Sequence, residues 1–382
     1  MPTITLETRQ IPVLLLTGYL GSGKTTLLNR ILSNRKGIKF AVIVNDIGEV
    51  NIDADLIEKG GLVGQMDDSL IALQNGCICC TLKMDLVAQI AEITTSRKFD
   101  YIVIEASGIC EPAPIAQTIS TLPAFGPQDI HDTMPYVDCI VTVVDALRMK
   151  DEFALGNALE RDDLEDDDLE RLVIEQVEFC NIVLLNKAAD ISPEELNHLR
   201  GIISAINPKA RILPCNYGDI DLDEIIYTGM FDFDAVATSA AWIAAIEGED
   251  EEEEAEGEAY EYGIDTFVYS RRPAFDLNKF DHFVARSWPA NVIRAKGMCY
   301  FSDDRDKCWL FEQAGRQKSL REAGLWYATM PEEELAVMMN RDPVLRRDWD
   351  PEYGDRMQKL VFIGQHLDKE GLTKLLDRCL ED

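Results

Sequence analysis

The sequence predicts an α/β fold, a mostly parallel sheet flanked by helices, followed by a smaller α+β domain. Three observations predict it. Up to about Met230, short and nearly continuous apolar runs alternate with helix-like segments, as strands and crossover helices do in a parallel sheet. The length of 382 residues exceeds the usual size of one domain. An acidic run, Glu247–Glu261, has the composition of a linker because its like charges repel and bury nothing.

We therefore expect a first domain over residues 1–230, an acidic linker over 231–261 and a second domain over 262–382. Six apolar runs in the first part are expected strands: Ile11–Thr17, Lys39–Val44, Tyr101–Ile104, Cys139–Val144, Ile182–Leu185 and Arg211–Pro214. A helix is expected after Ser192, because Pro193 and Glu195 complete a capping box with proline at the first helical position. The second part shows fewer signals, namely strands near Ile264–Tyr269, Val292–Lys296 and Leu360–Ile363, and helices after Asp276 and Asp368.

The composition excludes several classes of protein. No apolar run approaches the roughly 18 to 20 residues that span a bilayer, so a membrane protein is not expected. Lys and Arg total 37 against 69 for Asp and Glu, a net charge of -32 that repels nucleic acid and anionic lipid. The N-terminal residues lack the basic flank and apolar stretch of a signal peptide, so we expect a cytoplasmic protein with reduced cysteines.

The loop after the first expected strand carries the most specific motif. The sequence GYLGSGKT, Gly18–Thr25, matches G-x-x-x-x-G-K-[ST], the phosphate-binding loop of nucleotide-binding proteins, between a strand and a helix as that loop requires. Its backbone amides and the helix N-terminus would surround the phosphates, Lys24 would reach the β and γ phosphates, and Thr25 would bind Mg²⁺. The expected nucleotide-binding residues of this loop are Gly18, Gly21, Ser22, Gly23, Lys24, Thr25 and Thr26.

A second acidic group is expected to hold the water shell of the metal from the end of a neighbouring strand. Glu105 ends the apolar run DYIVIE and is our candidate, so Lys24 and Glu105 are the expected catalytic residues. Gly108 follows three residues later, where its backbone amide could sense the γ phosphate as a switch element. No glutamine or arginine is identified as the hydrolytic residue.

Recognition of the base is expected after the strand Ile182–Leu185. Proteins that bind guanine carry N-K-x-D at this place, in which the aspartate pairs with the guanine edge and the lysine covers the ring. Here Asn186 and Lys187 are followed by two alanines before Asp190, one residue too many. Asp190 reaches the base only if the loop bulges, and otherwise the base specificity is altered. GTP is the expected nucleotide and ATP the alternative.

Three of the ten cysteines, Cys77, Cys79 and Cys80, fall within four residues between the apolar segment Leu70–Leu73 and a helix beginning near Lys83. Three thiolates at this spacing predict a tetrahedral Zn²⁺ site with a fourth ligand from elsewhere, although copper(I) and cobalt(II) also suit them. A buried apolar trio or a redox pair are the alternatives. The other cysteines are expected to be structural: Cys110, Cys139, Cys180, Cys215, Cys299, Cys308 and Cys379.

The motifs GYLGSGKTTLLNRIL, VNDIGEVNIDADLI, NGCICCTLKMDL and DYIVIEASGICEPAPI, together with YGIDTFVYSRRPAFD and KLVFIGQHLDKEGL, resemble the CobW family of phosphate-loop GTPases along nearly the whole chain. Members of that family are linked to delivery of zinc, cobalt or other metals. The resemblance implies that Cys77, Cys79 and Cys80 bind the delivered metal. It also implies that Lys24, Thr25 and Glu105 serve the nucleotide and Mg²⁺. Asn186 and Lys187 are implied to contact guanine.

The chain departs from the family at one loop. Val44 and Asp46 stand where relatives often have glutamate, which leaves Glu49 as the matching carboxylate for the metal. The function predicted is a GTP-hydrolysing metallochaperone that delivers zinc to a client metalloprotein, with metal affinity linked to the change from GTP to GDP. The alternatives are a nucleotide switch that acts through a protein partner and uses its cysteines structurally, and a small-molecule kinase on the same scaffold.

Overall fold

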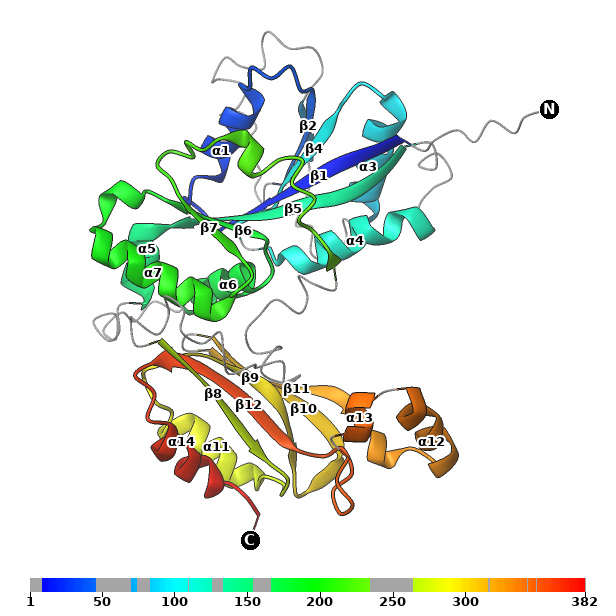
Figure 1. The fold of residues 1–382 in the computed structure, drawn as a ribbon, viewed down its shortest axis with the longest axis vertical. Helices are drawn as coiled ribbons and strands as arrows, with labels where there is room; N and C mark the ends of the chain where they lie inside the picture. Colours follow the sequence, from blue (N-terminus) through cyan, green and yellow to red (C-terminus); the bar gives the residue numbers. More distant parts are fainter. Residues whose placement is uncertain are drawn as a thin grey trace, which may run out of the picture. The chain divides into compact units, whose positions relative to one another are not determined.

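The structure is a computed structural model, and it describes residues 9–45, 70–73, 83–108, 110–125, 133–153, 166–233, 264–314, 317–341, 343–347 and 349–381. The chain forms two compact units, each built around one sheet (Figure 1). The expected linker, 231–261, lies almost entirely outside the described residues. Among the described residues, no helix has the length and apolar character needed to cross a bilayer.

The first sheet has seven described strands in the order β3-β2-β4-β1-β5-β6-β7, and every neighbouring pair is parallel. The six expected strands are all present. The seventh, β3, was expected only as an apolar segment. The strands are β1 Arg9–Thr17, β2 Phe40–Asn45, β3 Leu70–Leu73, β4 Tyr101–Glu105, β5 Thr133–Asp145, β6 Ile182–Asn186 and β7 Arg211–Pro214.

Helices flank this sheet, as a parallel sheet requires (Figure 1). In α1, Leu27, Leu28 and Ile31 are fully buried and pack in one cluster with Leu14 and Leu16 of β1. The helices are α1 Lys24–Leu32, α3 Lys83–Ser96, α4 Pro112–Phe125, α5 Ala146–Phe153, α6 Asp166–Glu178 and α7 Pro193–Ile206, with short 3₁₀ turns η3 Ala188–Asp190 and η4 Leu222–Glu224.

The capping box expected at the start of α7 is confirmed. The backbone amide of Ser192 donates to Glu195 Oε2 at 2.9 Å, and the amide of Glu195 donates to Ser192 Oγ at 3.3 Å. Lys150 also pairs with Glu195, at 2.5 Å. These hydrogen bonds satisfy amides that have no partner within the first turn of a helix.

The second sheet has five antiparallel strands in the order β11-β10-β9-β12-β8. Asp276 and Asp368 cap the two helices expected after them, accepting from the amides of Lys279 and Gly371 at 2.9 Å each. The elements are β8 Ile264–Arg271, α11 Leu277–Arg286, β9 Val292–Phe301, β10 Asp304–Ala314, β11 Gln317–Leu325, η5 Tyr327–Thr329, α12 Glu332–Arg341, α13 Pro343–Arg347, β12 Gln358–Gln365 and α14 Lys369–Asp377.

The core of the second unit is largely aromatic. Phe280 and Phe283 of α11 pack with Phe362 of β12 and Phe311 of β10. Glu312 of β10 pairs with the nearly buried Arg294 and Lys296, at 3.8 and 2.5 Å. Both basic side chains are therefore ion-paired with one carboxylate.

All seven described cysteines are buried and free of disulfides. Burial raises the pKa of Cys215 and Cys379 to about 11, and that of Cys180 and Cys308 to about 12. A thiol with so high a pKa is protonated at neutral pH and is a poor nucleophile and metal ligand. This agrees with the structural role expected for them.

Candidate nucleotide-binding site

The loop between β1 and α1 has the backbone shape of a phosphate cradle. Gly18, Gly21 and Gly23 adopt left-handed φ angles of 133°, 81° and 109°, which side chains rarely allow. Two of them also lie against other groups. A Cβ atom on Gly18 would lie 2.3 Å from the carbonyl oxygen of Val143, and one on Gly23 would lie 2.3 Å from Asn186 Nδ2. The backbone conformation therefore explains all three glycines, and the lack of room for a side chain is a second reason at Gly18 and Gly23.

Lys24 begins α1 and is buried, with Nζ folded back over the loop. It donates to the carbonyl oxygens of Gly18 at 2.6 Å and Tyr19 at 3.2 Å. Ser22 is also buried, and its Oγ has no hydrogen-bond partner among the residues that the structure describes. Buried hydroxyls are normally hydrogen-bonded, so this one indicates a polar ligand in the loop. Thr26, in the same turn of α1, is exposed.

Glu105 ends β4 beside the first turn of α1 and is buried. The Oγ1 atom of Thr25 donates to Glu105 Oε1 at 3.5 Å, so the sheet brings together the two residues expected at the Mg²⁺ site. A hydroxyl and a carboxylate are the hard oxygen ligands that Mg²⁺ prefers, directly or through water. This donor set fits Mg²⁺.

Gly108 lies against the backbone of the phosphate loop. A Cβ atom at this position would lie 2.8 Å from the amide nitrogen of Leu20 and 3.3 Å from the carbonyl carbon of Tyr19. Only a residue without a side chain permits so close an approach. The segment after β4 and the phosphate loop are therefore in direct backbone contact, which is the arrangement that a switch at Gly108 needs.

Asn186 joins the phosphate loop to the expected base loop. It is buried, and its Nδ2 donates to the carbonyl oxygen of Ser22 at 2.8 Å. Lys187 has a left-handed φ of 60°, and its Nζ pairs with Asp145. Asp190 is the exposed third residue of η3. Ala189 occupies the aspartate position of N-K-x-D, and its amide donates to Asn216 Oδ1 at 2.8 Å.

Sequence reasoning missed Asp145 and Tyr19. Tyr19 is buried in the phosphate loop, and its hydroxyl donates to the carbonyl oxygen of Asp145 at 3.1 Å and accepts from the Asp145 amide at 3.0 Å. Asp145 also caps α5, accepting from the amide of Leu147 at 3.1 Å. The signal was available, because Asp145 ends an apolar strand just as Glu105 does.

The expected metal ligands Cys77, Cys79, Cys80 and Glu49 lie outside the described residues. Within the described part of the chain, no group of three or more His, Cys, Asp or Glu side chains could hold a metal ion.

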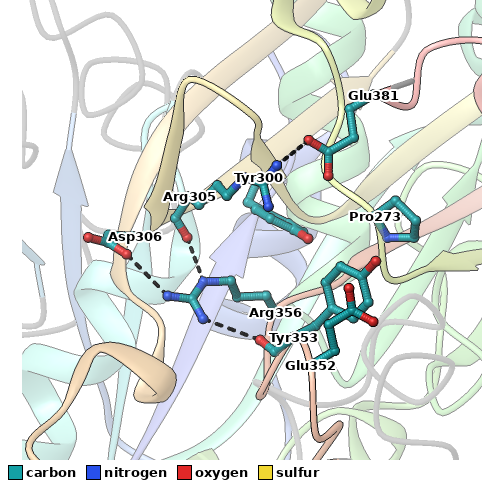
Figure 2. A pocket seen from close by; sticks show the side chains of 8 residues that line it. All are labelled: Pro273, Tyr300, Arg305, Asp306, Glu352, Tyr353, Arg356 and Glu381. Atoms are coloured by element: carbon teal, nitrogen blue, oxygen red, sulfur yellow. Dashed lines mark hydrogen bonds and ion pairs between the residues drawn. The ribbon is translucent and has the colours of Figure 1, made fainter.

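A cavity of about 580 Å³ lies in the second unit, lined by Pro273, Tyr300, Arg305, Asp306, Glu352, Tyr353, Arg356 and Glu381 (Figure 2). The charged side chains that line it are largely paired with one another. Arg305 pairs with Glu381 at 2.5 Å, and Arg356 pairs with Asp306 at 3.1 Å and donates to the carbonyl oxygen of Arg305 at 2.8 Å. The arrangement stabilises the turn around Tyr353 and shows no catalytic grouping.

Residues 12–214 match the family described as "CobW/HypB/UreG, nucleotide-binding domain", and residues 264–380 match the "Cobalamin synthesis protein cobW C-terminal domain". The chain belongs to the CobW family. This confirms the resemblance drawn from the motifs and makes the protein a P-loop GTPase of the CobW/HypB type.

Relatives of known description are similar along most of this CobW chain. It is 34% identical over 387 residues to the "Zinc-regulated GTPase metalloprotein activator 1" of Dictyostelium discoideum, covering 97% of this chain and 80% of that protein. It is 29% identical over 315 residues to the "Zinc chaperone CobW" of Sinorhizobium sp, covering 78% of this chain and 83% of that one.

Proposed function

We propose that this CobW-family GTPase binds zinc through Cys77, Cys79 and Cys80 and passes it to a client metalloprotein, with zinc affinity set by the bound nucleotide. One observation carries the proposal: the three-cysteine segment follows β3, whose last residues lie in the same row of the sheet as Glu105. The names of the two relatives, a zinc-regulated GTPase activator and a zinc chaperone, support zinc as the metal.

The row is defined by the strand register. Leu16 pairs with Glu105, Glu105 with Val44, and Val44 with Ala72. Neighbouring strands are about 4.8 Å apart, so β3 ends about 10 Å across the sheet from Glu105. Cys77 comes only four residues after Leu73. Reciprocal coupling of zinc and nucleotide requires that both ligands bias this end of the sheet.

The nucleotide would be held by the loop amides and Lys24, with Thr25 and Glu105 holding Mg²⁺ directly or through its water. Mg²⁺ supplies positive charge that offsets the charge of the phosphates. Lys24 and Glu105 are the residues that we assign to catalysis. Lys24 offsets charge on the transferred phosphoryl group, and Glu105 orients the metal water shell. Gly108 reports the presence of the γ phosphate through its contact with Leu20.

The cysteines would bind zinc as thiolates, so zinc binding should release protons and strengthen as pH rises until the thiols are ionised. Glu49 is the carboxylate that we assign as a further ligand, since it comes four residues after the end of β2 in the sequence. The client is a protein whose zinc site is empty until the metal is transferred.

Zinc binding to Cys77→Ala tests the ligand set. We expect this variant to lose most of its zinc affinity while its affinity for GTP stays within about twofold, and Lys24→Ala to show the opposite pattern. Cys379→Ala is the matched control, since Cys379 is a buried thiol in the core of the second unit and its removal should leave zinc affinity unchanged. Unchanged zinc affinity in Cys77→Ala would refute the ligand set.

A further inference from the structure

We propose that the base of the bound nucleotide stacks on the ring of Tyr217, in the loop that follows β7. The inference rests on the nucleotide site described above and assigns a residue for base recognition that the N-K-x-D comparison does not. It is carried by the conformation and exposure of Tyr217 and by the hydrogen bonds that fix its loop against Asn186 and Ala189.

Tyr217 combines two unfavourable features. It is 77% exposed. Its φ is 52°, in the left-handed region that a bulky residue rarely adopts. Backbone strain of this kind persists only where surrounding contacts enforce it, and it is concentrated at functional sites.

The contacts that enforce it come from both neighbours of Tyr217. The side-chain oxygen of Asn216 accepts from the amide of Ala189 at 2.8 Å, and the amide of Gly218 donates to Asn186 Oδ1 at 3.2 Å. Arg30 Nε of α1 donates to the carbonyl oxygen of Tyr217 itself at 2.7 Å. The backbone of Tyr217 is thus held in place by the base loop on one side and by α1 on the other.

This loop lies where a base would be. It follows the carboxyl end of β7, next to the carboxyl end of β6, and ligands of parallel α/β sheets bind outside these ends. A Cβ atom on Gly218 would lie 3.1 Å from the Cα of Leu27, in the first turn of the helix that begins at the phosphate loop. Asn186 bonds to both Ser22 and Gly218, and so connects the phosphate end of the site to the Tyr217 loop.

Base stacking would also compensate for the carboxylate that is missing from the N-K-x-D position. Ala189 has no side-chain acceptor for the guanine edge, and its amide is already used by Asn216. Asp190 is exposed on η3. An aromatic face compensates because every base has a flat surface on which to stack, whatever its edge presents. Recognition at this site would then depend more on the ring of Tyr217 than on a carboxylate at the N-K-x-D position.

The test compares Tyr217→Asn with Tyr217→Phe. Asparagine tolerates a left-handed φ but has no ring, whereas phenylalanine keeps the ring and loses only the hydroxyl. We expect Tyr217→Asn to bind GTP and GDP at least about 5-fold more weakly, the lower end for loss of one base–aromatic stack, as measured by calorimetry. Tyr217→Phe should stay within about twofold of the parent.

Inorganic tripolyphosphate is the probe that separates the base from the phosphates. As a competitor without a base, it should bind Tyr217→Asn and the parent equally, whereas Lys24→Ala should lose both GTP and tripolyphosphate. Loss of both ligands in Tyr217→Asn would overturn the proposal, because the residue would then act through the phosphate loop. Unchanged GTP affinity in Tyr217→Asn would also overturn it.

Tyr227→Asn is the matched control. Tyr227 has the same φ of 52° and is 52% exposed, but its ring packs edge-on against Tyr101, the first residue of β4, with centroids 5.0 Å apart. It therefore lies at the amino end of β4, whereas the nucleotide site lies at the carboxyl ends of the strands. Tyr227→Asn should leave the affinity for GTP and GDP unchanged, and a loss equal to that of Tyr217→Asn would refute the specific role of Tyr217.

Discussion

Gly108→Ala should weaken nucleotide binding although the residue it changes has no side chain to contact a ligand. The φ of Gly108 lies outside the left-handed region, so the added methyl group acts through space alone. Its Cβ would lie 2.8 Å from the backbone nitrogen of Leu20, and backbone cannot rotate away as the end of a flexible side chain can. Either the segment after β4 or the phosphate loop must move.

Overpacking of this kind costs about 1–3 kcal/mol. If the cost falls on the shape of the loop that binds phosphates, it corresponds to a loss of about 5- to 150-fold in affinity, at 1.4 kcal/mol for each factor of ten. The loss should be larger for GTP than for GDP, because our account has Gly108 report the γ phosphate. Calorimetric titration of both nucleotides into the parent and the variant measures it.

Gly364→Ala is the control for a general loss of stability. Its Cβ would lie 2.3 Å from the carbonyl oxygen of Asn291, in the second unit, so it should lower the melting temperature and leave nucleotide affinity unchanged. If Gly108→Ala binds both nucleotides within about twofold of the parent, the contact between Gly108 and the phosphate loop has no functional weight and the switch assignment is wrong.

Three further predictions concern other contacts. Asn186→Ala should lower nucleotide affinity by about tenfold in calorimetry, because buried partners lose their hydrogen bonds; parental affinity would contradict this. Burial alone would raise the pKa of Glu312, but Lys296, Arg294 and Arg321 together lower it below the ordinary value of a glutamate, so the stabilising effect of its charge is lost as pH falls through the lowered pKa. Glu312→Gln should flatten this acid dependence of thermal unfolding while GTP hydrolysis is kept. In native protein at pH 8, a thiol reagent should label rapidly at most the three motif cysteines, and fast labelling of the seven buried ones would contradict this.

The parts of the fold that sequence could predict are those with continuous apolar character. The central strands are buried on both faces, so β1 and β4 appear in the sequence as unbroken apolar runs. β11 was missed because almost all of its residues are exposed, so that it shows no apolar alternation and is held by its backbone pairing with β10. β3 has only four residues, too few to establish a periodicity.

The nucleotide site, too, could be predicted from the sequence only in part. The phosphate loop and Glu105 were predictable because their residue types are fixed by local chemistry at a known spacing, and the structure places Thr25 and Glu105 together. The place of the Tyr217 loop beside the site was not predictable, because it depends on hydrogen bonds to a segment about thirty residues earlier in the chain. No spacing rule within one segment reveals such a contact.

The central claim is that nucleotide and zinc affect each other's binding. It is tested most directly by titrating zinc into the full chain loaded with a non-hydrolysable GTP analogue and, separately, with GDP, each with Mg²⁺. The account predicts that the two zinc dissociation constants differ by about 5-fold or more, the lower end of usual coupling between sites, and that this difference disappears in Gly108→Ala. Equal zinc affinities in the two nucleotide states of the parent would contradict it.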